Sequence, residues 1–427
     1  MQKWSQQENT VTYMDCGRVS MVNDVKGEFE AVKISHHVYW VGAIDWELRN
    51  FHGYSTNRGS TYNAYLIEAD DYILVDTVKA PFWHELISRI KSVVEPKKIR
   101  YIISNHSEMD HSGCMPAAID AIKPEKVFAS SMGAKALSRH FNLDFPVTVV
   151  SDGETIELAG LSITFLETRM LHWPDSMMTY LSDDRLLFSQ DGFGMHLASS
   201  ERFADEIPES VLLEEGSKYF ANILLPYAPL ILKLIERVSS LGIEIDVIAP
   251  DHGPIWRKDI GKIISLYKGW SSQKPALKAV IVYDTMWGST AKMAHSIAEG
   301  ILSKGVSVIV HCLTASHRSD VVTDLLDSGA LIVGSPTINN GIFPTVSDFL
   351  TYVKGLRPKN KIGAAFGSYG WSGEGTKQIA KILDEMKVEL LSDPLSVNYV
   401  PHDEDLLECR SLGEKIAERL MEVCADE

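Results

Sequence analysis

Cysteine is scarce in this sequence, and no two cysteines form a CxxC pair. This spacing argues against a thiolate zinc site, an iron–sulfur cluster and a disulfide framework, and it favours free thiols. The cysteines are Cys16, Cys114, Cys312, Cys409 and Cys424.

Long apolar runs and an excess of basic residues are also absent. No stretch approaches the apolar length needed to span a bilayer, and the polar N-terminus MQKWSQQENTVTYMD lacks the basic-then-apolar pattern of a secretory signal. We therefore expect a cytoplasmic protein without a membrane anchor. The formal net charge of -16 argues against broad binding to nucleic acid or anionic membranes, since both need a basic surface.

The length of 427 residues indicates two domains, each able to bury its own core. Residues 1–272 contain short apolar runs broken by turns and followed by helical patterns, which is typical of a layered α/β or α+β domain. In residues 273–427, buried-strand runs such as KAVIVYD and ALIVGSP alternate with helical segments. That alternation predicts a doubly wound parallel sheet, in which ligands bind at the carboxyl ends of the strands.

The segment SNHSEMDHSG, residues 104–113, concentrates potential metal ligands at the end of a predicted strand. Packed cores exclude ionised carboxylates unless a cation or an ion pair compensates their charge. So many ligating side chains in one short loop therefore indicate a metal site rather than a structural turn. They are His106, Glu108, Asp110 and His111.

Three further ligand candidates stand at later strand ends: His172 in TRMLHWPDS, Asp191 in LLFSQDGFG and His252 in VIAPDHGP. Each one alone is as compatible with a turn residue as with a ligand. Together with the first cluster they supply imidazole nitrogens and carboxylate oxygens for two metals, and Asp191 is short enough to bridge them.

A phosphate-binding loop, YDTMWGST, follows the first strand of the second half. Thr285, Ser289 and Thr290 offer hydroxyl groups, Gly288 allows close approach of the backbone, and a helix N-terminus follows at once. The loop lacks the lysine of a nucleotide-triphosphate loop, so it suits a monophosphate.

Two more loops with glycines and small polar residues follow later strands, at residues 334–344 and 366–373. Their backbone N–H groups can reach a flat heterocycle, while Tyr369 and Trp371 can shield it or stack on it. Either loop alone is also compatible with an ordinary turn, but all three loops at strand ends favour a cofactor site.

The order HxExDH, then His, Asp and His, resembles the metallo-β-lactamase-like domain of the flavodiiron proteins, as do the words FHGY, MLHWPDSM and PDHG. The second half resembles a flavodoxin domain, although Met286 and Trp287 depart from the simplest TxTGxT loop. The resemblance implies an N-terminal metallo-β-lactamase-like αββα sandwich followed by a C-terminal flavodoxin-like doubly wound parallel sheet. It also implies FMN and two non-haem iron ions in each chain.

The resemblance assigns His106, Glu108 and His172 to one iron, Asp110 and His252 to the other, and Asp191 to both. His111 either ligates the second iron or turns away from it, and we predict that it ligates. His52 and Tyr219 match positions that donate hydrogen bonds to an iron-bound diatomic, although packing explains both equally well. The residues matching the FMN site are Thr285, Met286, Trp287, Gly288, Ser289, Thr290, Pro336, Thr337, Asn339, Asn340, Gly341, Ser368, Tyr369, Gly370, Trp371 and Gly373.

Glu108 bears on the identity of the metal. Zinc hydrolases of the same fold usually read HxHxDH, so a carboxylate here stands where they have a histidine. A mixed site rich in carboxylate oxygen favours iron over zinc.

The expected function is reduction of O2 to water, of NO to N2O, or of both, with FMN relaying electrons. The chain ends at LMEVCADE without a CxxC-bearing rubredoxin module, so we expect a separate donor, with rubredoxin as the first candidate. The resemblance also implies a head-to-tail homodimer, alone or within a tetramer. The alternatives are a zinc-dependent hydrolase with an appended flavodoxin module, and an electron-carrying module with a structural metal.

Overall fold

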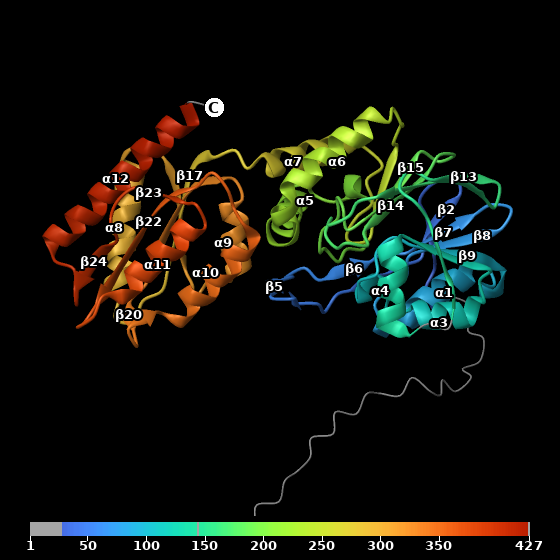
Figure 1. Ribbon diagram of the computed structural model, residues 1–427, viewed down its shortest axis with the longest axis horizontal. Coiled ribbons are helices and arrows are strands. Elements are labelled where there is room, and N and C mark those ends of the chain that lie inside the picture. The colour runs from blue at the N-terminus through green and yellow to red at the C-terminus, as the bar shows by residue number, and fades with distance from the viewer. Residues whose placement is uncertain (1–27, 143–144, 426–427) are drawn as a thin grey trace, which may run out of the picture.

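The computed structural model describes residues 28–142 and 145–425, so Cys16 lies outside the described residues. Two domains lie side by side, and the chain crosses between them after α7 (Ile260–Ser272) (Figure 1). The second domain begins with β17 (Ala276–Tyr283). We propose residues 1–272 and 273–427 as the domain bounds, because the chain leaves one set of layers and enters the other between these two elements.

The first domain has two sheets packed face to face, with strand orders β1-β2-β7-β8-β9-β10-β11 and β12-β13-β14-β15-β16. The short strands β3 (Ala43–Asp45) and β6 (Ser60–Tyr62) form one further pair, and β4 (Asn50–Phe51) and β5 (Tyr54–Ser55) form another. The sheet strands are β1 (Val32–Lys33), β2 (Val38–Trp40), β7 (Tyr65–Glu68), β8 (Tyr72–Val75), β9 (Ile99–Ser104), β10 (Lys126–Ala129), β11 (Val147–Val149), β12 (Thr155–Leu158), β13 (Leu161–Glu167), β14 (Met177–Leu181), β15 (Leu186–Gln190) and β16 (Val247–Pro250).

Alternation along the central strands builds the layers of this domain. In β8, Ile73 and Val75 pack between the two sheets, whereas Leu74 packs under the outer helices. Tyr65 and Leu66 of β7 divide in the same way, as the period of two in a strand requires. The helices are α1 (Trp83–Val93), α3 (Met115–Ile122) and α4 (Ser131–Phe141) by the first sheet, and α5 (Glu209–Tyr219), α6 (Ala228–Ser240) and α7 by the second. The predicted αββα sandwich is confirmed.

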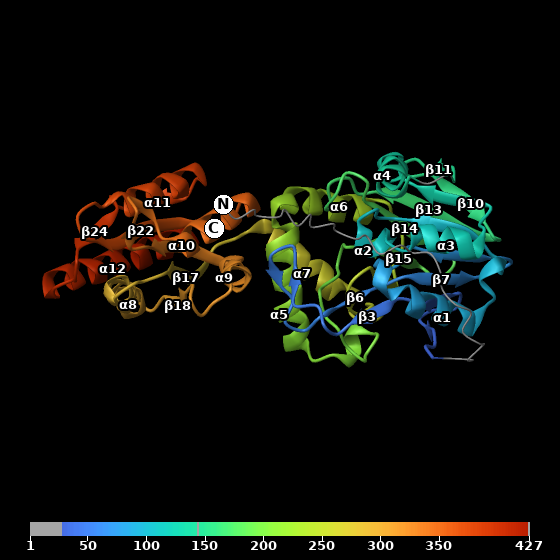
Figure 2. The ribbon, with the colours of Figure 1, turned by 90° about the horizontal axis from the view of Figure 1, so that it is seen from below.

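The second domain is a parallel sheet with the order β18-β17-β19-β22-β23, and β24 also pairs with β22. Its core lies on both faces: α8 and α12 contribute to one cluster, and α9, α10 and α11 to another (Figure 2). The predicted flavodoxin-like doubly wound sheet is therefore confirmed. The elements are β18 (Ser307–Cys312), β19 (Ser328–Gly334), β22 (Ile362–Tyr369), β23 (Glu389–Leu390), β24 (Leu395–Asn398), α8 (Ser289–Ser303), α9 (Arg318–Leu325), α10 (Pro344–Leu356), α11 (Glu374–Glu385) and α12 (Asp403–Ala425).

Two segments expected as loops contain regular structure. Residues 109–112 of the metal-ligand segment form a short helix, α2 (Met109–Ser112), instead of an irregular turn. Residues 334–344 include a hairpin of β20 (Thr337–Ile338) and β21 (Gly341–Ile342). Local hydrogen bonds that the sequence pattern did not reveal explain both differences, such as the bond from the Ser112 backbone N–H to the Glu108 carbonyl.

One segment, Glu209–Ser240, is long and apolar enough to cross a membrane by length and composition, although the sequence analysis expected none. In the structure it is not one uniform helix, because a π-helical turn, Phe220–Leu224, separates α5 from α6. Its apolar side chains, including Leu224 and Ile231, pack into a core cluster that also contains residues of the second domain. Packing in the protein interior thus accounts for its apolar character.

Helices α8 and α12 cross so closely that glycine is needed at the contact. A Cβ on Gly413 would lie 2.0 Å from the Ile297 carbonyl oxygen, whereas a Cβ on Gly355 in α10 would meet nothing within 4 Å. We expect Gly413→Ala to lower the free energy of unfolding of the second domain by about 1–3 kcal/mol, because overpacking forces the helices apart. Gly355→Ala should raise it by about 0.5–1 kcal/mol through helix propensity.

Urea denaturation followed by far-ultraviolet circular dichroism checks both changes. Equal stability of the Gly413→Ala variant and the wild type would contradict the close crossing.

Candidate metal centre and cofactor pocket

The first group of predicted ligands gathers between the ends of β9 and β15. His172 Nε2 lies 3.0 Å from Asp191 Oδ2 and 3.2 Å from Glu108 Oε2. His106 Nε2 lies 3.3 Å from Asp191 Oδ2 and 3.4 Å from Glu108 Oε2. One ligand atom from each of these four residues lies within 4.8 Å of the others, which is a spacing that one metal ion can fill.

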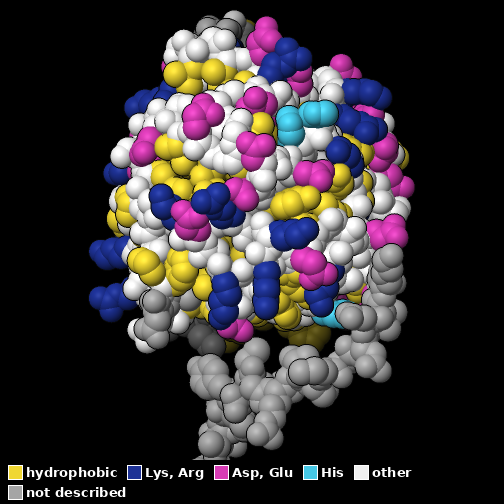
Figure 3. Space-filling model, turned by 90° about the vertical axis from the view of Figure 1, so that its right-hand side faces the viewer, with side chains coloured by type: hydrophobic (Ala, Val, Ile, Leu, Met, Phe, Trp, Pro, Cys, Tyr) yellow, Lys and Arg dark blue, Asp and Glu magenta, His cyan; other side chains and the backbone are white. Residues whose placement is uncertain are grey.

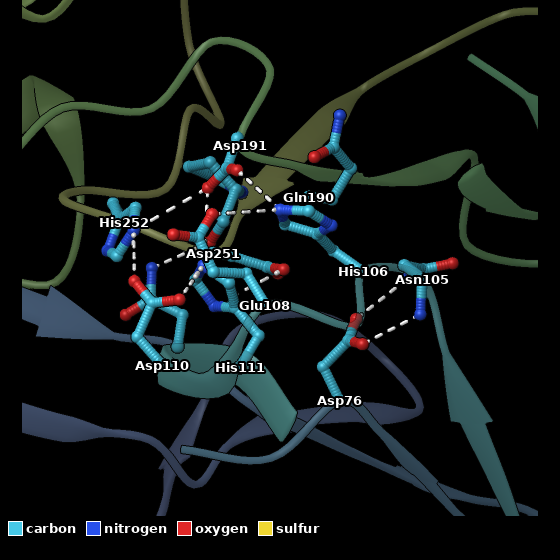
Figure 4. Close-up of polar contacts among 12 residues, drawn as sticks. Asp76, Asn105, His106, Glu108, Asp110, His111, Gln190, Asp191, Asp251 and His252 are labelled. Atoms are coloured by element: carbon cyan, nitrogen blue, oxygen red, sulfur yellow. Dashed lines mark hydrogen bonds and ion pairs between the residues drawn. The ribbon is translucent and has the colours of Figure 1, made fainter. Parts of the chain in front are cut away.

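The second group lies on the other side of Asp191 and consists of Asp110, His111 and His252 (Figure 4). His252 Nε2 is 3.3 Å from Asp110 Oδ2, and His111 Nε2 is 3.3 Å from Asp191 Oδ1. The imidazole of His111 therefore points into the cluster. Asp191 presents Oδ2 to the first group and Oδ1 to the second, as a bridging carboxylate would.

Ionisation in this cluster follows from charge pairing that outweighs burial. Burial by itself raises the pKa of Glu108, but contacts with His106 and His172 lower it to about 2. Burial lowers the pKa of His172, but Asp191 and Glu108 raise it to about 9. The acids are thus held ionised, and in the metal-free protein the imidazole protons supply the positive charge that metal cations would otherwise provide.

The residues fit metal ions because their inward atoms lack other partners. His106 Nε2, His111 Nε2, Asp191 Oδ1 and both carboxylate oxygens of Asp110 are buried without a hydrogen-bond partner among the described residues. Buried polar atoms left in this way are costly unless a ligand satisfies them. The mixture of imidazole nitrogen and carboxylate oxygen suits two iron ions.

Side chains and backbone behind the ligands fix the direction of their imidazole rings. Asp175 Oδ2 is 3.1 Å from His106 Nδ1 and accepts hydrogen bonds from the Ser107 backbone N–H and hydroxyl, both at 2.6 Å. The Thr61 carbonyl oxygen is 2.6 Å from His252 Nδ1. A hydrogen bond to Nδ1 leaves Nε2 to face the metal, so these contacts set the tautomer that a ligand needs.

The two predicted substrate-pocket residues both lie beside the metal cluster. His52 Nε2 is 3.4 Å from Glu108 Oε1, and the His52 side chain is 75% exposed. Tyr219 is buried, with its ring centroid 6.2 Å from that of His252, and burial raises the pKa of its phenol well above the usual value. Tyr219 therefore keeps its proton and can donate a hydrogen bond.

His196 is a site residue that the sequence analysis missed. It is fully buried, its Nδ1 lies 2.8 Å from Ser60 Oγ, and its ring centroid is 4.5 Å from that of His252. Burial and the neighbouring His252 hold its pKa well below the usual value, so it is a neutral imidazole. A single histidine in the apolar stretch FGMHLA gave no pattern from which to find it, and Asp175 was likewise hidden inside HWPDS.

A separate cavity of about 690 Å³ opens at the carboxyl ends of the second-domain strands. It lies where a flavodoxin-like sheet binds its ligand. The loop before α8 supplies a helix N-terminus, and Gly288 adopts a φ of 86° there, a conformation that glycine favours. The predicted residues that line this cavity are Met286, Trp287, Ser289, Pro336, Thr337, Asn339, Asn340, Ser368, Tyr369, Gly370 and Trp371.

The remaining predicted cofactor residues support the loops instead of lining the cavity. Thr285 Oγ1 accepts a hydrogen bond from the Gly288 backbone N–H, and Thr290 Oγ1 lies 3.3 Å from Ser368 Oγ. Gly341 belongs to β21 and Gly373 precedes α11. Three further residues, Ser372, Tyr399 and Val400, line the cavity without having been predicted from the sequence.

Family models match both domains. Residues 61–253 match the ODP family beta lactamase model, and residues 281–413 match the flavodoxin model.

Relatives match almost the whole chain. The nitric oxide reductase of Moorella thermoacetica is 46% identical over 395 residues, covering 92% of this chain and 99% of the relative. The rubredoxin-oxygen oxidoreductase of Megalodesulfovibrio gigas is 47% identical, covering 92% of this chain and 98% of the relative.

Solved structures agree with this similarity. The rubredoxin oxygen:oxidoreductase from Desulfovibrio gigas superposes with a TM-score of 0.91 at 47% identity, covering 93% of this chain and 100% of that chain. The flavodiiron protein from Giardia intestinalis has a TM-score of 0.89 at 33% identity, covering 93% of this chain and 98% of that chain.

We expect Asp175→Asn to weaken metal binding about 10- to 100-fold, because the neutral amide supports the His106 ring less strongly than a carboxylate does. Competition with a coloured chelator measures the affinity of the metal-free protein for ferrous iron. Asp184→Asn is the matched control, since Asp184 pairs with His37 outside the cluster. Equal metal affinity in both variants would contradict the role given to Asp175.

Proposed function

Because the chain belongs to the flavodiiron protein family, we propose that it is an oxidoreductase that reduces O2 to water, NO to N2O, or both. Bound FMN accepts and releases electrons singly or in pairs, and a bound iron pair supplies electrons and a binding place to a diatomic molecule. The observation that carries the proposal is the convergence of seven predicted ligands on two adjoining metal positions. The relatives named as a nitric oxide reductase and a rubredoxin-oxygen oxidoreductase align with 92% of this chain. This similarity argues against the hydrolase and the electron-carrier alternatives.

We assign the ligands by the positions of their atoms. Asp191 would be shared by the two irons, and His111 is included because its Nε2 faces the cluster. One iron would be held by His106, Glu108 and His172, and the other by Asp110, His111 and His252.

Two side chains of this chain act directly on the diatomic in our proposal. His52 reaches the Glu108 side of the cluster from a solvent-exposed position, and Tyr219 lies beside His252 in the interior. Each one would orient the substrate by donating a hydrogen bond, because O2 and NO offer only acceptor atoms. Apolar packing of Phe51 against His196 limits water in the same place.

The second domain binds FMN in the cavity at its strand ends. Ser289 and the N-terminus of α8 receive the phosphate, supported by Thr285, Gly288 and Thr290. The loops from β19 and β22 line the cavity and would hold the flavin ring, with Tyr369 and Trp371 as the aromatic side chains available to it. The lining residues assigned to the ring are Pro336, Thr337, Asn339, Asn340, Ser368, Tyr369, Gly370 and Trp371, and Met286 and Trp287 belong with Ser289 to the phosphate loop. Gly341 and Gly373 support the loops around the ring.

A rubredoxin-type protein is the proposed electron donor, in a cytoplasmic setting and without a membrane or nucleic acid as partner. The relative from Megalodesulfovibrio gigas is named for rubredoxin. The net charge of -16 disfavours polyanions, and on the face of the first domain seen in Figure 3 basic and acidic side chains alternate without one large basic patch.

We also propose a head-to-tail homodimer, alone or within a tetramer, in which each FMN faces the iron site of the other chain. The cavity elements β20 and β24 lie on the outer side of the second domain, whereas α9 and α10 lie toward the first (Figure 1). Trp287 and Trp371 are 93% and 89% exposed at the cavity mouth, which suits a surface that a second chain covers.

Gas consumption tests the proposed reaction. Iron-replete, FMN-replete protein supplied with reduced rubredoxin should consume O2, NO or both at gas-selective electrodes. Asp191→Asn should lower gas consumption at least about a hundredfold by disrupting the metal pair, while FMN reduction by the donor stays unchanged. If the flavin is reduced but neither gas is consumed by the wild type, the reductase proposal is wrong.

Co-expression of two inactive variants tests the head-to-tail dimer. Asp191→Asn impairs the iron site, and Ser289→Glu places a carboxylate where the phosphate binds. Mixed dimers would pair one intact FMN site with one intact iron site, so the mixture should recover about a quarter of wild-type turnover. No recovery in isolated mixed dimers would contradict electron transfer between chains.

A further inference from the structure

His52 stands at the tip of a hairpin too small to hold its own shape. Strands β4 and β5 pair through only Asn50–Ser55 and Phe51–Tyr54, with His52 and Gly53 as the turn. Both turn residues have positive φ, 52° and 87°, as the tightest hairpin turns require. An isolated two-stranded hairpin is marginally stable at best. The direction of the His52 side chain therefore depends on contacts made from outside the hairpin.

The first residue of α9 supplies one such contact from the flavodoxin domain. Arg318 Nη2 donates a hydrogen bond to the Gly53 carbonyl oxygen at 3.3 Å. Arg318 Nη1 lies 2.6 Å from both carboxylate oxygens of Asp348, which fixes the guanidinium in place. A Cβ on Gly53 would lie 2.5 Å from Arg318 Nη2, so the guanidinium packs directly on the turn.

The second residue of α9 supplies another contact. Ser319 Oγ accepts a hydrogen bond from the Ser55 backbone N–H at 3.2 Å and lies 2.8 Å from Ser55 Oγ. Lys218 Nζ donates to Ser55 Oγ at 2.9 Å and forms an ion pair with Asp320, the next residue of α9. These groups link the base of the hairpin to the flavodoxin domain across a buried surface.

On the side of the metal cluster, His52 has fewer constraints. Its ring lies 4.3 Å from the Phe51 ring, centroid to centroid, and its Nε2 is 3.4 Å from Glu108 Oε1. With three-quarters of the side chain exposed, packing within the first domain does not confine it. Phe51 and Tyr54 of the hairpin also pack on His196 of the first domain. The contacts with α9 add hydrogen bonds to the turn and to the base of the hairpin from which His52 reaches the cluster.

We propose that Arg318 and Ser319 of the flavodoxin domain are positioning residues for His52, holding its hairpin so that the imidazole faces the diatomic at the metal pair. This inference rests on the proposed function of His52. It gives the flavodoxin domain a second task besides FMN binding, namely completing the substrate pocket of its own chain.

Two variants test the proposal independently: Arg318→Met removes the guanidinium and Ser319→Ala removes the hydroxyl. Each should accelerate hydrogen exchange of the backbone amides of residues 50–55 about tenfold, by loss of one hydrogen bond, with FMN content unchanged. Arg318→Lys should restore part of the protection, because lysine keeps the charge without the forked geometry. Arg410→Met is the control, since Arg410 pairs with Glu414 on α12.

The rate at which the gas reoxidises the reduced protein, measured by stopped-flow, tests the effect of each variant on function. In protein reduced beforehand, Arg318→Met and Ser319→Ala should each slow reoxidation by the gas that the wild type consumes by about tenfold, while flavin reduction by the donor is unchanged. In a His52→Ala background neither variant should slow reoxidation further, because the residue through which they act is gone.

Three results would overturn the proposal. The first is unchanged hydrogen exchange of the backbone amides of residues 50–55 in both variants, and the second is faster exchange without slower reoxidation by the gas. The third is that the variants slow reoxidation equally in the wild-type and His52→Ala backgrounds. Failure of the proposed function can be distinguished from failure of this inference. If the wild type consumes neither gas, hydrogen exchange of residues 50–55 still shows whether Arg318 and Ser319 hold the hairpin.

Discussion

Compensation of buried charge is the constraint on which the metal centre depends. Glu108, Asp110 and Asp191 are almost fully buried, and each lies within about one hydrogen-bond length of an imidazole. Such a set is stable only with positive charge among the carboxylates, which protons provide in the metal-free protein and metal ions provide in the loaded one. The strands β9, β15 and β16 bring the ligands together because their ends meet at one edge of the sandwich.

The flavodoxin domain is joined to this centre by more than the connecting chain. Arg318 and Ser319 contact the hairpin that carries His52, while Asp320 pairs with Lys218, the residue before Tyr219. Tyr352 of α10 donates a hydrogen bond to Asn222, which lies in the π-helical turn after Tyr219. Both proposed substrate-pocket side chains thus come from segments that the second domain supports. Residues of β20 and residues just after β24 line the cofactor cavity, and these strands lie on the outer side of that domain (Figure 1), which is the geometric reason to propose transfer between two chains.

The sequence predicted well those features that depend on strand ends. HSEMDH follows β9, and Asp191 and His252 follow β15 and β16, so the gathering of ligand candidates could be inferred without coordinates. The pattern alone indicated a layered α/β or α+β domain, and the resemblance to the flavodiiron proteins supplied the αββα sandwich. Contacts between segments far apart in the chain could not be inferred from the sequence. Asp175 supports His106 from 69 positions away, and Arg318 meets Gly53 across 265 positions. Tyr399 reaches the cofactor cavity because β24 pairs with β22. His196 was missed because nothing local distinguishes a buried polar histidine from a core residue.

Anomalous diffraction from crystals of the purified protein, with data recorded on both sides of the iron and zinc absorption edges, tests the account most directly. We expect two iron peaks in each chain. One should lie among His106, Glu108 and His172, the other among Asp110, His111 and His252, with Asp191 between them. Zinc at both positions, or a single metal with its coordination closed by protein ligands, would contradict a di-iron reductase.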